Sequence, residues 1–439
     1  MKKGFAVTPG AQRERAFLVG VSLPGGSIAR EHDFLDELEQ LARTAGAEVV
    51  GRAVQGRTRI DSATFVGEGK AREIKEASDT AGANLVIFDN DLSPAQARNL
   101  HKIFDLRIID RTELILDIFA RHAKTQAAKI QVELAQLEYT LPRLTRMWSH
   151  LERQQGGIGT RGPGETQLET DRRQIRRRMS VLREELKKIS QRKDTIRKSH
   201  GALYTVALIG YTNAGKSTLM RGLTGADVFI EDQLFATLDT TTRKIRNGSN
   251  GRDGHSGNGR HEILLIDTVG FIRKLPHHLI TSFKATLADI AHADLYLHVV
   301  DVSHPAFEEQ IEVADNAVRS IQNPDAGTVY VFNKIDRVFD RELEVLKRRY
   351  EDGVFVSASS GVGLDDVWHR IDRYFQNRGV KVEVKIPAGD GKGISRIRSI
   401  IRNAVGSFEG DVCVLRGTIA SDQMGRLENV PGARVRFLL

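Results

Sequence analysis

Cysteine is nearly absent from this chain of 439 residues, because it occurs only once, at Cys413. A single cysteine excludes any disulfide within the chain and fits a reducing compartment. No apolar run approaches the roughly 18 residues that a membrane-spanning helix needs. The first residues, Met1-Lys2-Lys3-Gly4-Phe5, also lack the apolar core of a signal peptide. We therefore expect a cytoplasmic protein.

The rest of the composition is ordinary for a soluble globular protein, with 40% hydrophobic and 28% charged residues. The length predicts about three domains. In residues 1–110, apolar runs typical of strands alternate with amphipathic stretches typical of helices, such as 33–45. This alternation predicts a small parallel α/β domain. Its glycine-containing segment 65–70 has no Ser or Thr after Lys70, so we favour a structural turn over a phosphate loop.

Residues 111–199 have the spacing of a coiled coil. Two sets of apolar residues repeat at alternating steps of four and three, which places each set on one seam of a helix. The Gly-rich stretch 156–165 between them continues neither helix. We expect an antiparallel helical hairpin, with a seam formed by Ile130, Leu134, Leu137 and Leu141, and by Ile175, Met179, Leu182, Leu186 and Ile189.

The same region holds the positive charge of the chain. From Arg143 to Lys198 there are 16 Lys or Arg against 7 Asp or Glu, a net charge of +9, whereas the whole chain is +8. A solvated helix face is the simple interpretation, but we favour a surface for a polyanion, above all RNA. The sequence alone does not separate RNA from DNA or from acidic lipid. The densest cluster is Arg172, Arg173, Arg176, Arg177 and Arg178.

A glycine-bracketed loop lies between an apolar strand at 203–209 and the start of a helix at 218–223. The two glycines allow backbone N–H groups to turn toward phosphate oxygens, and the helix N-terminus adds partial positive charge. Lys216 supplies a cation for the outer phosphates, and the Ser217 hydroxyl can bind Mg²⁺. The context disfavours an ordinary βαβ turn. The P-loop is Gly210-Tyr211-Thr212-Asn213-Ala214-Gly215-Lys216-Ser217.

Three further motifs each follow an apolar strand. Asp267-Thr268-Val269-Gly270 fits the Mg²⁺ side of the γ-phosphate, with a backbone N–H at its glycine. Asn333-Lys334-Ile335-Asp336 ends in a carboxylate that accepts from N1–H and N2–H₂ of guanine, a donor pair that adenine lacks. Ser357-Ala358-Ser359 offers backbone groups for the guanine O6. Motifs in this order, each at the carboxyl end of a strand, predict a GTPase domain.

The segment after the P-loop should form the first switch, in which a Thr hydroxyl binds Mg²⁺ when the γ-phosphate is present. The residues alone leave Thr237, Thr240, Thr241 and Thr242 open. Farther on, the run 247–260 has five glycines and no apolar residue, which predicts a hairpin tip without chemistry. His255 and His261 lack partners for a metal site, so we discount one.

Together these features resemble the HflX family of translation-associated GTPases. The resemblance spans residues 17–376, and its most family-specific motif is the Gly-rich segment 156–169. It implies a monomeric cytosolic protein that binds the large (50S) ribosomal subunit in its GTP form and acts in subunit dissociation, rescue or biogenesis. It also implies that Thr237 is the switch threonine on Mg²⁺, within Phe235-Ala236-Thr237-Leu238-Asp239. Two departures are Thr240, where the family usually has Pro, and the longer 247–260 tip.

The expected fold is α/β. It comprises an N-terminal α/β domain at 1–110, the hairpin at 111–199, a P-loop GTPase domain with a mostly parallel sheet at 200–379 and a small α+β domain at 380–439. In the last, we expect strands at 382–384, 412–415 and 433–438 and a helix at 393–403. Catalysis is assigned to Lys216, Thr237 and Gly270. Ser217 and Thr237 are assigned to Mg²⁺, the cofactor of GTP and GDP.

A residue found in many GTPases is missing here. Many have a Gln after the Asp-x-x-Gly turn that orients the attacking water, whereas this chain has Phe271 and then Ile272. We therefore expect slow hydrolysis by the isolated protein and activation by a partner surface. Two other classes stay open: a nucleic-acid-remodelling, RNA helicase-like ATPase, and a GTPase with weak membrane-surface association through its basic helix.

Overall fold

The computed structural model describes residues 14–24, 28–146, 163–199, 203–225, 234–235, 241–246, 262–274, 290–319, 321–420, 427 and 430–438. The chain divides into two compact units. The first comprises Met1–Lys187, Asp232–Leu238 and Lys274–Phe283. The second comprises Lys188–Glu231, Asp239–Arg273 and Lys284–Leu439. Within the described part of the chain, no helix is both long and apolar enough to cross a membrane.

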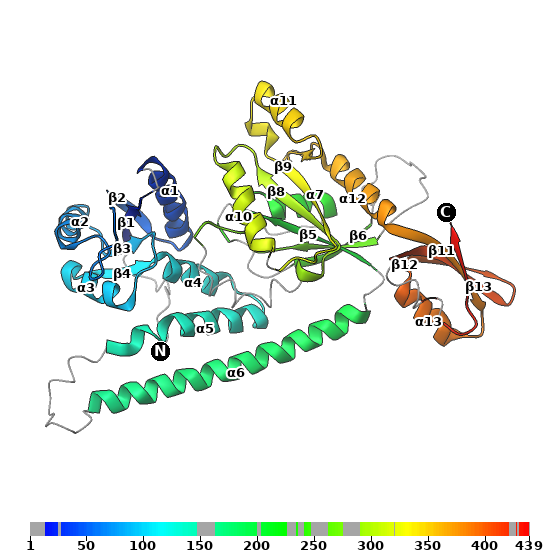
Figure 1. Cartoon of the computed structure of the whole chain (residues 1–439), viewed down its shortest axis with the longest axis horizontal. Coiled ribbons are helices and arrows are strands. Elements are labelled where there is room, and N and C mark those ends of the chain that lie inside the picture. Colours follow the sequence, from blue (N-terminus) through cyan, green and yellow to red (C-terminus); the bar gives the residue numbers. More distant parts are fainter. Residues whose placement is uncertain are drawn as a thin grey trace. The chain divides into compact units, whose positions relative to one another are not determined.

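The first unit is built on a parallel sheet of four strands in the order β2-β1-β3-β4 (Figure 1). Phe17, Val86 and Phe88 of its strands are buried with Ile74 and Leu100 of its helices. Parallel neighbours need a crossover, and helices supply it here, so the expected parallel α/β fold is confirmed. The elements are β1 (Arg15–Ser22), α1 (Ile28–Thr44), β2 (Glu48–Gly56), α2 (Glu68–Thr80), β3 (Leu85–Phe88), α3 (Pro94–Phe104) and β4 (Arg107–Asp110).

In the segment 65–70, residues 65–67 form a structural turn and residues 68–70 begin α2. Phe65 is buried in the core of the first unit and has a left-handed backbone, with φ of 65°. It forms an isolated bridge with Asp61, and Arg57 donates a hydrogen bond to the Val66 carbonyl. These contacts account for the glycine-containing sequence without any phosphate.

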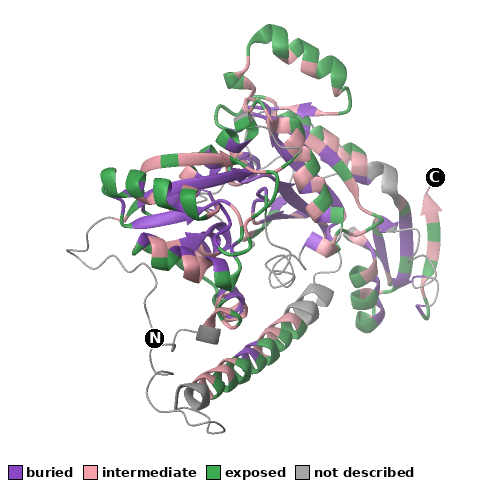
Figure 2. Cartoon of the chain, turned by 60° about the vertical axis from the view of Figure 1, so that its left-hand side comes forward, coloured by how far each residue is buried: buried purple, intermediate pink, exposed green. Residues whose placement is uncertain are grey.

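Helices α4 (Arg111–His122), α5 (Gln126–Thr140) and α6 (Pro163–Ser199) follow, with the 3₁₀ turn η1 (Arg143–Arg146) after α5. Arg178 and Arg183 of α6 form ion pairs with Glu133 and Glu138 of α5, so the two helices lie side by side (Figure 1). Met179 and Leu182 of the predicted seam are buried, whereas much of α6 is exposed (Figure 2). Of the Gly-rich stretch 156–165, residues 156–162 lie outside the described residues. The prediction that this stretch continues neither helix is wrong at its end, because residues 163–165 begin α6, where Pro at the first helical position is favourable.

The second unit contains a six-stranded sheet in the order β10-β9-β8-β5-β7-β6. Only β6 is antiparallel to its neighbour among the pairs of this sheet that the structure describes, which confirms the expected mostly parallel sheet. The strands are β5 (Tyr204–Gly210), β6 (Thr241–Arg246), β7 (Glu262–Asp267), β8 (Leu295–Asp301), β9 (Gly327–Asn333) and β10 (Val354–Phe355). The helical elements are α7 (Lys216–Thr224), η2 (Ile290–His292), α10 (Phe307–Arg319), η3 (Ile335–Arg337), α11 (Asp340–Arg349) and α12 (Leu364–Arg378).

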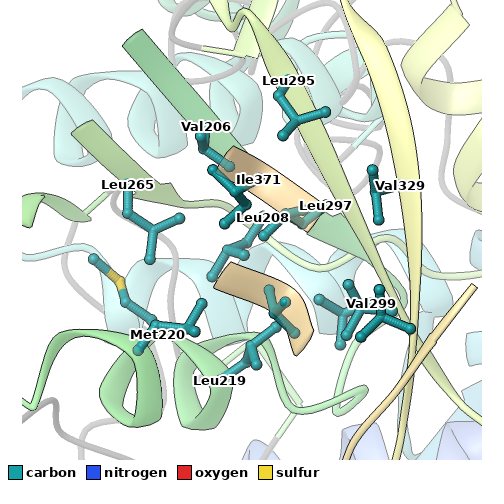
Figure 3. Packing of buried hydrophobic residues seen from close by; sticks show 14 of the residues in the cluster. Val206, Leu208, Leu219, Met220, Leu265, Leu295, Leu297, Val299, Val329 and Ile371 are labelled. Carbon is teal, nitrogen blue, oxygen red and sulfur yellow. The ribbon is translucent and has the colours of Figure 1, made fainter. Parts of the chain in front are cut away.

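Apolar side chains from strands and helices fill the core of this sheet (Figure 3). Leu208 of β5 and Leu297 of β8 are fully buried together with Leu219 and Met220 of α7 and Ile371 of α12. Strands buried by helices in this way show nearly continuous apolar runs in the sequence. Their close packing holds the carboxyl ends of the strands, where the nucleotide motifs lie.

The second unit also has an antiparallel sheet in the order β12-β13-β11-β14, with the helix α13 packed against it. The predicted α+β fold is confirmed, but the prediction of a helix at 393–403 missed β12. The helix ends at Ile400, and β12 is an edge strand whose Val405 and Phe408 are 72% and 68% exposed. It therefore lacks the buried alternation that reveals a strand. The elements are β11 (Gly379–Pro387), α13 (Gly391–Ile400), β12 (Arg402–Glu409), β13 (Val412–Ala420) and β14 (Arg434–Leu438).

Side-chain contacts connect this antiparallel sheet to the six-stranded sheet. Tyr204 of β5 stacks on Phe375 of α12, with 4.1 Å between ring centroids, and its hydroxyl lies 3.2 Å from the Thr418 hydroxyl of β13. Arg402 forms an ion pair with Asp294 at 2.9 Å. The antiparallel sheet thus contacts the six-stranded part of the second unit through polar groups.

Candidate functional site

The loop from Gly210 to Ser217 joins the end of β5 to the start of α7, as the sequence predicts. Gly210 and Gly215 both have positive φ, at 142° and 93°. A Cβ on Gly210 would lie 2.2 Å from the Val299 carbonyl oxygen, and a Cβ on Gly215 would lie 2.2 Å from Asn333 Nδ2. No side chain fits at either position, so glycine is required for both the backbone angles and the space.

Lys216 occupies the interior of this loop. Its side chain is buried, and its Nζ donates to the carbonyl oxygens of Tyr211 at 2.8 Å and Gly210 at 3.3 Å. Burial lowers the pKa of Lys216 to about 8, although the nearby Asp267 carboxylate favours the charged form. The amine is therefore held close to the loop backbone, and its charge is sensitive to an added anion.

Ser217 and Asp267 meet at the start of α7. The Ser217 hydroxyl donates to Asp267 Oδ2 at 2.6 Å, and Asp267 is almost fully buried at the end of β7. The pair places a hydroxyl and a carboxylate, both hard oxygen donors of the kind that Mg²⁺ prefers, beside the P-loop. The donor set fits a magnesium ion. Among the described residues, no grouping of three or more His, Cys, Asp or Glu could hold a metal.

The turn at 267–270 is hydrogen-bonded directly to the P-loop. Phe271 N–H donates to the Gly210 carbonyl at 3.0 Å, and Thr212 N–H donates to the Phe271 carbonyl at 2.7 Å. A Cβ on Gly270 would lie 2.9 Å from Lys216 Nζ, so the Gly270 backbone passes close to the amine. The Thr268 hydroxyl donates to the Leu208 carbonyl at 2.6 Å. The second motif is thus fixed against the first.

Asn333 connects the P-loop to the loop that follows β10. Its Nδ2 donates to the Ala214 carbonyl at 2.8 Å, and its Oδ1 accepts from the Ala358 N–H at 2.9 Å. The side chain is buried, and each amide atom has a backbone partner. The Ser357 and Ser359 hydroxyls lie 3.1 Å apart in the same loop. Asn333 therefore holds three of the predicted motifs at one edge of the sheet.

Asp336 and Lys334 follow Asn333. Asp336 lies in η3 and is exposed to solvent. Lys334 has a left-handed backbone with φ of 65°, and its Nζ donates to Asp301 Oδ2 at 2.6 Å. The sequence analysis missed Asp301, although its place at the carboxyl end of β8 could have pointed to it.

The first switch is described only in part. Ala236, Thr237, Leu238 and Asp239, and also Thr240 and the 247–260 tip with its His255, lie outside the described residues, as does His261. Phe235 is described and buried, and its ring meets Phe119 of α4 edge-on, with 4.7 Å between centroids. Thr241 and Thr242 begin β6.

Lys274, four residues after Gly270, belongs with Phe235 to the first compact unit. Its Nζ forms an ion pair with Asp89, a buried carboxylate that also accepts from Arg111. Its ammonium lies 4.2 Å from the centre of the Phe34 ring. Neither Lys274 nor Asp89 follows from a local motif, so the sequence analysis missed both.

Three family models match the chain in succession. The model described as "GTP-binding GTPase N-terminal" matches residues 32–120, and "GTP-binding GTPase Middle Region" matches 122–200. The model described as "50S ribosome-binding GTPase" matches 205–334, which includes the P-loop and the motifs at 267–270 and 333–334. The matched regions follow the order of the elements described above.

Curated relatives share most of the chain. A protein named GTPase HflX from Flavobacterium psychrophilum is 50% identical over 74% of this chain and 76% of its own. The GTPase HflX of Escherichia coli is 42% identical over 84% of this chain and 85% of its own, and that of Magnetococcus marinus is 39% identical over 97% of both. The chain is thus a GTP-hydrolysing enzyme, and the ATPase alternative is not favoured. With the P-loop, the guanine motif and the helical hairpin all present, this chain belongs to the GTPase HflX family.

Proposed function

We propose that this GTPase converts GTP to GDP and phosphate while associating with the large (50S) ribosomal subunit, in ribosome subunit dissociation, rescue or biogenesis. The observation that supports it most is the hydrogen-bonded convergence of the P-loop, the 267–270 turn and Asn333 at one sheet edge. The proposal places the protein in the cytoplasm as a monomer. It assigns nucleotide turnover to residues 200–379, with 1–110, 111–199 and 380–439 as the accompanying domains.

The phosphates bind along the P-loop at the start of α7, where the buried lysine is positioned for anions. Ser217 and Thr237 are the proposed ligands of Mg²⁺, and Asp267 holds the Ser217 hydroxyl in place. When bound there, Mg²⁺ neutralises charge on the outer phosphates. Lys216, Thr237 and the Gly270 N–H are the proposed catalytic groups around the γ-phosphate. The proposed phosphate-contacting residues are Gly210, Tyr211, Thr212, Asn213, Ala214, Gly215, Lys216, Ser217, Asp267, Thr268, Val269 and Gly270.

The guanine base binds at the exposed end of β9. The Asp336 carboxylate accepts from N1–H and N2–H₂, and the backbone of Ser357, Ala358 and Ser359 faces O6. Asn333 holds the base loop against the P-loop, so base and phosphate recognition are rigidly connected. Lys334 and Ile335 complete the base motif, and Phe235, Ala236, Leu238 and Asp239 flank the switch threonine.

The ribosomal partner is proposed from two findings. The model that matches residues 205–334 is described as a 50S ribosome-binding GTPase, and Escherichia coli HflX matches 84% of this chain and 85% of its own. The structure adds a basic helix, because Arg173, Arg176 and Arg177 of α6 are exposed. Within the described residues, neither these three nor Arg172 forms an ion pair. Cations without local partners are available to phosphates.

Co-sedimentation with purified large subunits tests the proposal. The protein should pellet with the subunits in the presence of a non-hydrolysable GTP analogue, and less of it should pellet with GDP. Flotation with anionic vesicles in the same buffers tests the membrane-surface alternative. Pelleting that is equal in every nucleotide state, or binding to vesicles but not to subunits, would contradict the proposed function.

A further inference from the structure

The antiparallel sheet of the C-terminal region has one face that helix α13 covers. Val382, Val384 and Ile386 of β11 are buried on that face with Ile397 and Ile401 of the α13 segment. Because successive side chains of a strand point to opposite faces, the intervening Lys381, Glu383 and Lys385 lie on the other one. The covered face thus accounts for the apolar residues of β11 and leaves its charged residues elsewhere.

The strand register brings further cations to the same side. Glu383 lies opposite Arg416 of β13 and Arg436 of β14, and Lys385 lies opposite Arg434. The alternation in β14 is similar, because Val435 and Phe437 pack with the apolar cluster. We call this surface the basic sheet face. Its cations are Lys381, Lys385, Arg416, Arg434 and Arg436, all exposed, and its carboxylates are Glu383 and Glu409.

Glu383 fixes the position of Arg416 on the basic sheet face, and one carboxylate does not neutralise the five cations there. Its carboxylate accepts from Arg416 Nε at 2.7 Å, and Lys385 and Arg436 lie near it. The hydrogen bond from Arg416 holds the pKa of Glu383 below its usual range, and Lys385 and Arg436 act in the same direction. The Arg416 side chain remains 57% exposed. One fixed carboxylate therefore orients a guanidinium whose surface is still open to a ligand.

The chemistry of the face favours phosphates over a protein partner. Centres of protein interfaces are depleted of charge and rich in aromatic residues, whereas the described strand residues of this face include five exposed cations and no aromatic side chain. Its other residues include Val405, Val412 and Val414, and Thr418, whose hydroxyl meets that of Tyr204. Neighbouring strands lie about 4.8 Å apart and alternate residues about 6.8 Å apart, so the charges are spaced regularly over the face. Arginine forks match phosphate oxygens in pairs. Without aromatic platforms, we expect no base stacking and little sequence preference.

We propose that the basic sheet face is a second RNA-binding surface of this protein, separate from α6, which contacts the sugar-phosphate backbone independently of sequence. The proposal rests on the proposed function, since ribosomal RNA is then the partner. It assigns binding to the region 380–439. An acidic protein and an anionic membrane are the competing partners.

The test uses the full chain with Arg416, Arg434 and Arg436 changed to Gln. The matched control changes Lys392, Arg396 and Arg398 to Gln, because these exposed residues of α13 are on the helix that covers the opposite face. A second variant, with only Arg434 and Arg436 changed, keeps the pair of Arg416 and Glu383. Binding to a 20-base-pair RNA duplex and to large subunits is measured between 50 and 200 mM KCl.

The slope of log affinity against log salt should fall by about two to three for the triple variant, at roughly 0.7 to 0.9 per phosphate contact. The slope of the double variant should fall by up to about two, and the slope of the control by less than one. Equal slopes for the triple variant and the wild type, or equal losses in the control, would overturn the proposal. Polyglutamate represents the competing acidic protein, and anionic vesicles represent the competing membrane. If the triple variant loses binding only to polyglutamate or only to vesicles, the proposal is also overturned.

The two proposals fail separately. If the wild type binds the duplex through the basic sheet face but does not bind large subunits, the RNA surface stands and the ribosomal function fails. If the wild type pellets with large subunits and the triple variant does so with the same salt slope, the ribosomal function stands and the basic sheet face does not contribute.

Discussion

Asn333 shows how single residues hold the nucleotide site together. Its amide group makes one hydrogen bond to the P-loop and one to the 357–359 loop, and both are buried. A buried amide that loses its partners costs about 1 to 3 kcal/mol, so these loops are strongly constrained to one arrangement. Asp336, by contrast, is exposed, which leaves its carboxylate accessible to a base.

Changing Asp336 to Asn should shift the base specificity of the nucleotide site from guanine toward xanthine. The substitution replaces an acceptor with a donor opposite N1–H and N2–H₂, so GTP affinity should fall by roughly two or more powers of ten while XTP affinity rises. Equilibrium binding of both nucleotides checks this. Asp340→Asn is the matched control, since Asp340 is an exposed carboxylate that begins α11. Unchanged GTP binding by Asp336→Asn would refute the guanine assignment.

Lys216 should make GTP binding sensitive to pH. Burial lowers its pKa to about 8 in the free protein, and bound phosphates favour the charged form and raise it. Below pH 8 the lysine is charged in both the free and the GTP-bound protein, so it does not make GTP affinity depend on pH. Above pH 8 binding takes up a proton, so affinity falls, by up to about tenfold per pH unit.

Calorimetry at pH 8.5 in two buffers of different ionisation enthalpy measures that proton. The apparent binding enthalpies should differ between the buffers in proportion to uptake, and the difference should disappear near pH 6.5. Buffer-independent enthalpies at pH 8.5 would show that Lys216 is already fully charged in the free protein.

At the scale of elements, the strand ends could be predicted because their signals are local. An apolar run followed by Gly210 or Asp267 identifies a strand and the loop after it, and the structure has both. Elements and site residues that depend on contacts between distant parts of the chain could not be predicted. The edge strand β12 has exposed apolar residues and no alternation, and Asp301 is recognised only by its contact with Lys334. The same holds for Lys274, whose partner Asp89 is distant in sequence.

Helix α6 combines a structural and an ionic role. Arg178 pairs with Glu133, and Arg183 with Glu138, so these arginines hold α6 against α5. Arg173, Arg176 and Arg177 are exposed, and like charges at such spacing repel one another on a helix. A cluster that costs helix stability is consistent with selection for an anionic partner.

Changing Arg172, Arg173, Arg176 and Arg177 to Gln should weaken binding to large subunits. The slope of log affinity against log salt should fall by up to about 3.6, at roughly 0.7 to 0.9 per lost phosphate contact. GTP affinity should not change, because these residues lie outside the nucleotide motifs. The control removes the same number of exposed cations from α11, at Arg341, Lys347, Arg348 and Arg349. An unchanged slope in the α6 variant would exclude this cluster as the RNA surface.

At the scale of the whole molecule, the described residues bring the P-loop, the 267–270 turn and the base motif together but place no water-orienting Gln after Gly270. The P-loop, Lys216 and the Ser217–Asp267 pair are in place for phosphates and Mg²⁺. After Gly270, however, come Phe271 and Ile272, which are 5% and 2% exposed and have no polar side-chain group. Neither can orient the attacking water that a Gln orients in many GTPases.

We therefore propose that this GTPase is a timer whose hydrolysis depends on a partner. GTP favours the bound state, and the partner completes the site by ordering the switch around Thr237 or by adding a polar group. A group supplied in this way accelerates hydrolysis by about 10³ to 10⁵ in other GTPases. The proposed partner is the large ribosomal subunit, which the basic surfaces of the chain would contact.

Single-turnover GTP hydrolysis, measured with and without purified large subunits, tests this claim most directly. We predict slow hydrolysis by the protein alone and a rate about 10³ to 10⁵ times higher when subunits are present, the range known for completed sites. Equal rates in the two reactions, or fast hydrolysis by the isolated protein, would contradict it.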